Sequence, residues 1–449
     1  MEKLSFFDKL NLKIKNSITI KLIVIGILFL IMLIPVSMIE SIIREREYRR
    51  SEAISEVCSK WGNEQTIAGP ILSIPYKSFY KIKEGKEEKN VAQIKYAHFL
   101  PEILNTDVLI KPEIRYRGIF EAAVYKSEIN LSGKFNNPDF SEWEVSDKDI
   151  LWNDAFISIG VSDMRGIKNY VNMSWNGDTL SFNPGIETND VLASGISAKF
   201  PVKNKKLIYD FSVNIELNGS QKIYCAPLGK ETTVKMNSNW NSPSFDGAYL
   251  PDKRNIGENG FDAEWKILHL NRNYPQKWLN NTFNVSESEF GTKLLIPVDH
   301  YSKTMRSIKY ASMFISLTFL MFFFVEILNK KRIHPIQYIL AGLALCIFFT
   351  LLLSISEHIN FNLTYFISSL TIIAVITGYA RTIFKQNKLT FFLFGILLIL
   401  YGFIFTVLQL EDYALLLGSL GLLIIISAVM YLSRKINWYD LENSEIKNN

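Results

Sequence analysis

The stretch IQYILAGLALCIFFTLLLSIS, residues 336–356, carries no charged side chain and is long enough to cross a bilayer as a helix. Other apolar runs of similar length accompany it in the last third of the chain, from about Met305 onward. They are residues 307–328, 363–384, 389–408 and 413–432. Because the connections between these runs are short, we expect residues 305–433 to form a compact bundle of five transmembrane helices.

One more apolar run, residues 18–39, stands alone near the N-terminus. It is too long for the hydrophobic region of a secretory signal peptide, and no small-residue cleavage site follows it. Pro35, Glu40 and a run of charged residues follow instead. We therefore expect a retained transmembrane helix at residues 18–39, preceded by a short segment at residues 1–17.

The composition favours a membrane protein with a large polar part. Hydrophobic residues make up 48% of the chain and the mean hydropathy is +0.10, too polar for a pure transporter-like bundle and too apolar for a soluble enzyme. A single core rarely exceeds about 250–300 residues, so a chain of 449 residues implies at least two domains. The net charge of +5 is small and no long basic tract lies outside the membrane flanks, so we do not expect nucleic acid as a partner.

The lysines and arginines of the short loops predict the orientation, because such residues concentrate on the cytoplasmic side. Six spans place the N-terminus, the C-terminal tail and two basic loops on one side of the membrane. The opposite loops carry Glu357, Glu411 and Asp412 and no lysine or arginine. We therefore expect residues 1–17 and 434–449 in the cytoplasm and residues 40–304 outside it, in the periplasm. The basic residues are Lys330, Lys331, Arg332, Arg381, Lys385, Lys388, Arg434 and Lys435.

Residues 40–304 change their hydrophobic period along the way. At first apolar residues recur every three or four positions, which predicts a helix that continues the first span as far as Gly62. Beyond Gly69 the period is two, as in residues 211–217, and short runs are separated by Gly, Pro and Asn. The expected fold class is therefore an α+β membrane protein: one N-terminal transmembrane helix, a large, mainly antiparallel β extracytoplasmic domain, and a C-terminal bundle of five transmembrane helices.

The chain lacks the sequence signatures of common catalytic sites. We find no phosphate-binding loop, no nucleophile elbow, no H-E-x-x-H and no Cys/His metal spacing. We therefore expect no cofactor, no metal ion and no catalytic residues, although an enzyme stays open as the alternative. The three cysteines, Cys58, Cys225 and Cys346, form no disulfide framework. Unpaired thiols are favoured, while a Cys58–Cys225 bridge stays open.

Four polar residues close to the outer membrane surface form the candidate functional or structural cluster. Glu357 and His358 close the third span, and Arg306 and Lys309 stand at the outer start of the second. Ionisable residues in membrane segments are costly and often functional. At span ends water is near, so interfacial anchoring and structural pairing are the favoured alternative. We expect Arg306 or Lys309 to lie beside Glu357. Glu326, near the cytoplasmic end of the second span, is a further polar residue in this class.

A set of short motifs, in order and nearly end to end, resembles the CreD family of polytopic inner-membrane proteins of Gram-negative bacteria, named for cell envelope integrity. The motifs are LIP at 33–35, GPIL at 69–72, RGIFEA at 117–122, GVSDMRG at 160–166, SPSF at 242–245, RSIKY at 306–310, RIHPIQY at 332–338, SISEH at 354–358 and DYALLLGS at 412–419. The resemblance supplies no reaction and no catalytic residues to carry over to these positions. Phe120 departs from the Tyr that is common there.

The resemblance implies a multi-pass protein of the cell inner membrane that acts in the envelope stress response, with effects on colicin tolerance and on the response to β-lactams. The leading hypothesis is a non-enzymatic protein that supports envelope integrity by binding an unknown envelope protein, lipid or glycan through its periplasmic β domain. Membrane lipids are the other expected partner. The alternative is a membrane-embedded enzyme or lipid-handling protein whose site lies at the outer membrane face, at Glu357, His358, Arg306 and Lys309.

Overall fold

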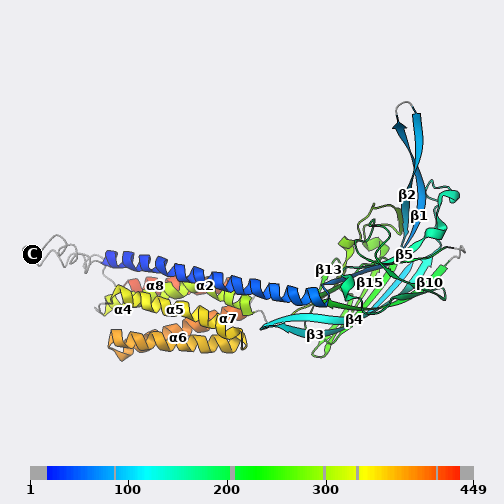
Figure 1. Cartoon of the computed structure of the whole chain (residues 1–449). Coiled ribbons are helices and arrows are strands. Elements are labelled where there is room, and N and C mark those ends of the chain that lie inside the picture. The colour runs from blue at the N-terminus through cyan, green and yellow to red at the C-terminus, as the bar shows by residue number, and fades with distance from the viewer. Residues whose placement is uncertain are drawn as a thin grey trace, which may run out of the picture. The chain divides into compact units, whose positions relative to one another are not determined.

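The computed structural model describes residues 18–84, 87–202, 208–296, 300–329, 333–410 and 413–434. The chain divides into two compact units. One comprises Met1–Arg50 and Val298–Asn449 and is helical where it is described; the other, Ser51–Pro297, is mainly β-sheet (Figure 1).

Helix α2 (Ile18–Trp61) is a single helix of 44 residues, despite Pro35 in its interior. Its first part, to Arg50, belongs to the helical unit, and its last part belongs to the β unit. Within the first part, i,i+4 ion pairs support the exposed stretch before Arg50: Arg44 to Glu40 at 2.7 Å and Arg49 to Glu45 at 2.6 Å. The predicted continuation of the first span as a helix is confirmed.

Six further helices cover the stretches of the five remaining predicted spans. Helices α3 and α4 meet at a bend of 41° and together cover one predicted span. Within the described residues four helices, α2, α5, α6 and α7, are long and apolar enough to cross a membrane, and the bent pair makes a fifth. The described apolar stretch of α8, Leu416–Tyr431, is shorter, so the sixth span stays a prediction. The helices are α3 (His300–Lys309), α4 (Ala311–Leu328), α5 (Pro335–Ser356), α6 (Phe361–Phe384), α7 (Asn387–Gln409) and α8 (Ala414–Ser433).

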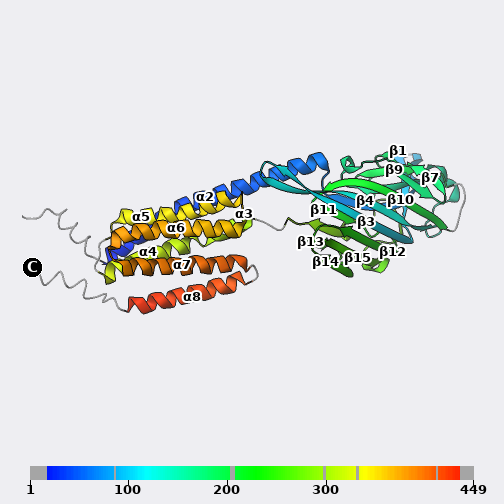
Figure 2. The ribbon, with the colours of Figure 1, turned by 90° about the horizontal axis from the view of Figure 1, so that it is seen from below.

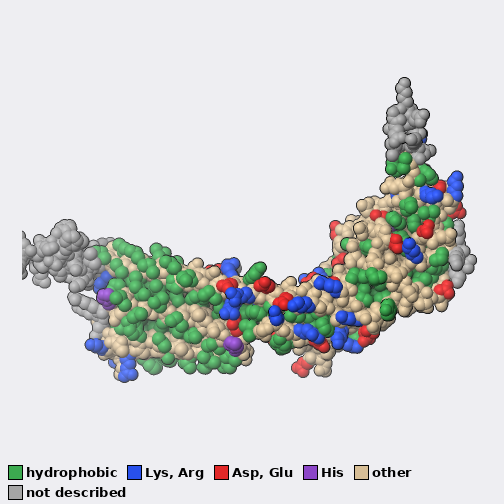
Figure 3. All heavy atoms as spheres, in the orientation of Figure 1, with side chains coloured by type: hydrophobic (Ala, Val, Ile, Leu, Met, Phe, Trp, Pro, Cys, Tyr) green, Lys and Arg blue, Asp and Glu red, His purple; other side chains and the backbone are tan. Residues whose placement is uncertain are grey.

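The helices pack around aromatic side chains and present apolar ones outward. Helices α5, α6 and α7 lie side by side (Figure 2), with the rings of Phe314, Phe348 and Tyr401 in mutual contact in the interior. On the outside, Phe391 and Ile399 are 75% and 70% exposed. Hydrophobic side chains cover most of the visible surface of this unit (Figure 3). Such a surface is stable only in an apolar solvent, which agrees with a membrane bundle.

The β unit contains two sheets in its described residues. Their pairing is antiparallel except for β1 with β11 and β3 with β12. The first sheet runs in the order β13 (Pro243–Gly247), β17 (Phe290–Leu294), β11 (Lys222–Cys225), β1 (Gln65–Glu84), β5 (Phe156–Val161), β9 (Gly195–Lys199), β8 (Asn183–Pro184), with β2 (Glu87–Phe99) on β1 and β16 (Lys277–Leu279) on β2. The second runs β14 (Lys253–Gly257), β15 (Gly260–Leu268), β12 (Glu231–Ser238), β3 (Ile103–Arg117), β4 (Phe120–Asn136), β10 (Ile208–Ser220), β6 (Asn172–Trp175), β7 (Asp178–Ser181).

The inner faces of the two sheets share one hydrophobic core, and the period-two pattern is the reason. Along β10 every second residue from Tyr209 to Leu217 is buried while its neighbours face solvent. Trp175 and Trp265 are fully buried in this core, so they stabilise the fold and do not line a cleft. Cys58, Cys225 and Cys346 are free and buried, and burial raises the pKa of the Cys225 thiol to about 12.

Candidate functional site

Two polar clusters lie at opposite ends of α5, and both hold α2 to the other helices of its unit. One is centred on Glu326, beside the first turn of α5, and the other on Glu357, directly after its last residue. The α2 residues involved, Lys21 and Arg46, are 25 positions apart, which is about 37 Å along a helix. This span matches a bilayer between its two headgroup layers.

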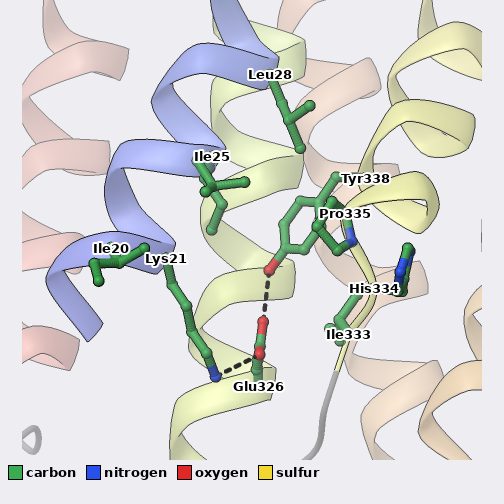
Figure 4. Close-up of a pocket in the computed structure, with 10 residues that line it drawn as sticks. Ile20, Lys21, Ile25, Leu28, Glu326, Ile333, His334, Pro335 and Tyr338 are labelled. Atoms are coloured by element: carbon green, nitrogen blue, oxygen red, sulfur yellow. Dashed lines mark hydrogen bonds and ion pairs between the residues drawn. The ribbon is translucent and has the colours of Figure 1, made fainter. Parts of the chain in front are cut away.

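The Glu326 cluster consists of Lys21, Glu326 and Tyr338 (Figure 4). Lys21 Nζ lies 2.8 Å from Glu326 Oε1, and the Tyr338 hydroxyl donates to Oε2 at 3.1 Å. Glu326 is only 5% exposed, whereas Lys21 is 26% exposed. A carboxylate buried this far needs a counter-ion and hydrogen bonds, and both oxygens of Glu326 have them.

A cavity of about 350 Å³ adjoins this cluster, and its wall is mostly apolar. Glu326 and Lys21 lie at its polar side (Figure 4). His334 borders it and caps α5, since its Nδ1 accepts a hydrogen bond from the backbone N–H of Ile336 at 3.3 Å. A cavity with one ionic side and one apolar side suits an amphipathic occupant. Its remaining lining residues are Ile20, Val24, Ile25, Leu28, Ile333, Pro335 and Tyr338.

The Glu357 cluster consists of Arg46, Tyr301 and Glu357. The Tyr301 hydroxyl donates to Glu357 Oε1 at 2.9 Å, and Arg46 Nε lies 3.9 Å from the same oxygen. The Arg46 side chain is 43% exposed, so this ion pair is worth less than the buried one. The cluster links α2, α3 and the end of α5 through hydrogen-bonding groups of three different elements.

The four residues predicted as a site are distributed over two neighbouring elements. Arg306 and Lys309 lie on α3, which packs against α5, while Glu357 and His358 follow α5. The contacts described for Glu357 come from Arg46 and Tyr301, so its pairing with Arg306 or Lys309 stays a prediction. His358 is exposed, and its backbone N–H donates to Ile355 O at 3.0 Å, which closes the helix.

Sequence reasoning missed Lys21, Arg46, Tyr301 and Tyr338. One signal was available: Lys21 is the one charged residue in residues 18–39, and Glu326 is the one acidic residue in residues 307–328. Opposite charges at a similar depth in two spans predict a pair, because either charge alone is costly in lipid. The tyrosines carry no comparable signal, since tyrosine is common at membrane interfaces.

In the β unit, Ser73, His98 and Asp190 have the composition of a hydrolytic triad, but their reactive atoms are not accessible to solvent. Ser73 Oγ lies 2.9 Å from His98 Nδ1, and Asp190 Oδ2 lies 3.3 Å from Nε2. Ser73 and His98 are 2% and 1% exposed, so a substrate has no path to the hydroxyl. Burial lowers the pKa of His98 despite the neighbouring Asp190, which favours the neutral ring. The group is a hydrogen-bonded part of the core.

The motif GVSDMRG serves to hold the end of α2 against the β unit. Asp163 accepts hydrogen bonds from the backbone N–H of Asn63 at 2.9 Å and from Arg165 at 2.8 Å. Arg165 also donates to the Ser59 carbonyl oxygen, in the last turn of α2. These bonds, that to Arg165 above all, lower the pKa of Asp163. Beside it, Trp61 donates to the Tyr125 carbonyl oxygen at 3.1 Å. The motif is therefore structural.

No cation site accompanies these clusters: among the residues that the structure describes, no group of three or more His, Cys, Asp or Glu side chains is placed to hold a metal ion. The described polar clusters thus join helices to one another or to a sheet. Their ionisable groups are partnered within the protein, and none presents an accessible nucleophile beside a base.

Comparison with known proteins finds similarity along nearly the whole chain. The family described as "Inner membrane protein CreD" matches residues 17–439. The Escherichia coli (strain K12) protein named "Inner membrane protein CreD" is 33% identical over 426 residues, which cover 93% of each chain. The match includes α2, the β unit and the helical bundle alike. The chain belongs to the CreD family of inner membrane proteins.

Proposed function

We propose that this inner-membrane protein supports cell envelope integrity without catalysing a reaction, by binding an envelope component through its β unit. The bundle anchors the protein, and the β unit lies in the periplasm. The N-terminus and the C-terminal tail lie in the cytoplasm. This orientation rests on the basic loops at residues 330–332 and 381–388 and on the acidic loops opposite them.

One observation carries the proposal: a single uninterrupted helix, α2, belongs to both units. In the bundle it is held by the Lys21–Glu326 ion pair and by the contact of Arg46 with Glu357. In the β unit its last turn is held by Arg165 and Trp61. A protein that carries a binding domain on a membrane anchor needs this kind of continuous connection, whereas an enzyme needs a reactive site.

The test interrupts α2 at the boundary between the units. Four residues, Gly-Ser-Gly-Ser, are inserted between Arg50 and Ser51, and the variant is expressed in cells that lack the native gene. We expect normal protein level and membrane insertion but loss of resistance to envelope stress by detergent and β-lactam. The matched control carries the same insertion between Glu258 and Asn259, an exposed turn of the β unit, and keeps its function. Full function of the α2 variant would refute the proposal.

A lipid-handling role is the second candidate, and the cavity beside Glu326 favours it. An apolar wall next to a lysine–glutamate pair suits a phospholipid with its headgroup at the ion pair. The outer cluster around Glu357, with His358, Arg306 and Lys309, would be a second contact with lipid. Purified protein that retains one phospholipid per chain, and loses it when Leu28 is replaced by Trp to fill the cavity, would support this candidate over the first.

A further inference from the structure

Strands β1 and β2 continue well beyond the sheet to which they belong. They pair with each other from Leu72–Phe99 to Glu84–Glu87. Their other neighbours stop early: β5 pairs with β1 only as far as Ser73, and β16 pairs with β2 only at residues 97–99. Near the base of the two strands, the Tyr76–Ile150 bridge and a hydrogen bond from the Asn280 backbone N–H to the Tyr96 carbonyl oxygen at 2.8 Å are described in addition. The described residues 77–84 and 87–95 therefore form a two-stranded ribbon that projects from the unit (Figure 1).

The described part of this ribbon exposes apolar side chains. Phe79 is 56% exposed, Ile94 57% and Tyr80 46%. The register pairs Phe79 with Ala92 and Lys77 with Ile94, so Phe79 and Ile94 are diagonal neighbours on the same face. Lys77 and Lys81 alternate with Phe79 along β1 and belong to this face as well. We call these four residues the lysine–phenylalanine face.

An isolated two-stranded ribbon is marginally stable in water, because it has no core of its own. Packing cannot explain the exposed Phe79 and Ile94, since nothing described in the β unit covers them. Self-pairing through the open edges is disfavoured, because lysines on an edge strand repel a second copy. A partner that is both apolar and negatively charged would contact both kinds of side chain on this face.

The net charge of the ribbon indicates what kind of partner it binds. Residues 77–96 contain six lysines and three glutamates, so their net charge is +3. Lysines beside aromatic and aliphatic side chains are typical of surfaces that bind anionic bilayers, where the charges meet the headgroups and the apolar groups enter the acyl boundary. A soluble polyanion would engage the lysines but would leave Phe79 and Ile94 in water.

We propose that the lysine–phenylalanine face of the β1–β2 ribbon binds the headgroup layer of a membrane that contains anionic lipid. This inference rests on the proposed function and names the envelope component that the β unit binds. The ribbon adds a second membrane contact to a protein already anchored through its bundle.

The test uses the full chain in nanodiscs of phosphatidylcholine, immobilised by its C-terminus. Vesicles of phosphatidylcholine alone, or with 30% phosphatidylglycerol, flow over the surface. We expect anionic vesicles to bind at least tenfold more tightly and the binding to weaken with added salt. Lys77→Gln/Lys81→Gln should weaken it by about thirtyfold, since each lysine near an anionic surface contributes roughly a factor of five. Phe79→Ser/Ile94→Ser should weaken it by about tenfold.

A matched control, Lys235→Gln/Lys253→Gln, removes two exposed lysines from other strands of the β unit and should change the affinity less than twofold. A second readout uses Phe79→Cys labelled with an environment-sensitive dye, which is selective because Cys58, Cys225 and Cys346 are buried. Its emission should shift to the blue on anionic vesicles and stay unchanged on dextran sulfate. The inference would be overturned if both kinds of vesicle bound with equal affinity. It would also be overturned if Phe79→Ser/Ile94→Ser left the affinity for anionic vesicles unchanged. Either result would leave the α2 insertion test, and so the proposed function, standing.

Discussion

The helical bundle and the β unit use their buried polar groups in different ways. In the bundle the described ion pairs at Glu326 and Glu357 lie near helix ends and hold α2 against its neighbours. In the β unit most of the described ion pairs are exposed, and the buried Asp163 fixes the end of the same helix. In both units, then, buried charge secures α2, while apolar packing supplies the bulk of the stability.

If apolar packing dominates in the β unit, Trp265→Ala should have the largest effect on stability. Trp265 is 0% exposed and packs against Phe245 and Phe290. Loss of a buried tryptophan side chain costs about 3–5 kcal/mol. The measurement is the thermal unfolding midpoint of the full chain in detergent. Tyr170→Ala, at a residue 97% exposed, serves as the control and should leave the midpoint unchanged.

In the bundle the substitution expected to reduce stability most is Lys21→Met, because it leaves Glu326 without its counter-ion. Removing one partner of a buried pair costs about 3 kcal/mol, because the remaining charge is unpaired in a medium of low polarity. The double variant Lys21→Met/Glu326→Met should be more stable than the single one, since it leaves no buried charge. A double-mutant cycle on unfolding midpoints measures this coupling. Additive losses would mean that the two residues do not interact.

The predicted spans coincide with helices because a long apolar run in lipid must satisfy its backbone hydrogen bonds internally, and a helix does so. Residues 363–384 became α6, which begins at Phe361. The bend between Lys309 and Ala311 was not predicted, because no proline or glycine marks it. The pairing of Lys21 with Glu326 depends on which helices are neighbours, and hydrophobicity alone does not predict that.

In the β unit the alternation of residues 211–217 predicted a strand with one buried face, and β10 has it. The order of strands within two sheets did not follow from the sequence, since many strand pairings bury the same side chains. The candidate site was less predictable still. Its four residues were chosen for position near the membrane, and the described partners of Glu357 come from α2 and α3 instead.

The buried Asp163 should give the β unit a specific dependence on pH. Its pKa in the folded state is lowered, chiefly by Arg165, from a value near 3.9 in the unfolded chain. The stability it contributes is therefore present above about pH 4 and is lost as the pH falls through the folded-state value. Asp163→Asn should cost about 2 kcal/mol at pH 7 and almost nothing below that window. Unfolding midpoints of both proteins at pH 7 and pH 3 provide the comparison, and a constant difference would contradict it.

The smallest effect on stability is expected for the Glu357 cluster. Arg46 is 43% exposed and lies 3.9 Å from Glu357, so Arg46→Gln should change the free energy of unfolding by less than about 1 kcal/mol.

For function, Glu357→Gln and His358→Ala should weaken the envelope phenotype only in part, because a binding surface distributes its binding energy over many groups. Complete loss with either variant, at normal protein level, would favour an enzyme, where one acid or base is worth about 10²–10⁴ in rate. Disulfide crosslinking of paired cysteines at 306/357 and 309/357 tests the predicted neighbours directly.

The central claim is that the β unit lies outside the cytoplasm, and labelling of single cysteines tests it most directly. Tyr170→Cys places a thiol at a residue 97% exposed in the β unit, and Lys385→Cys places one in a loop assigned to the cytoplasm. The native cysteines are buried, so background labelling is low. A membrane-impermeant maleimide added to spheroplasts should label the cysteine at position 170 and should reach position 385 only after lysis. Labelling at position 385 in intact spheroplasts, with position 170 protected, would contradict the account.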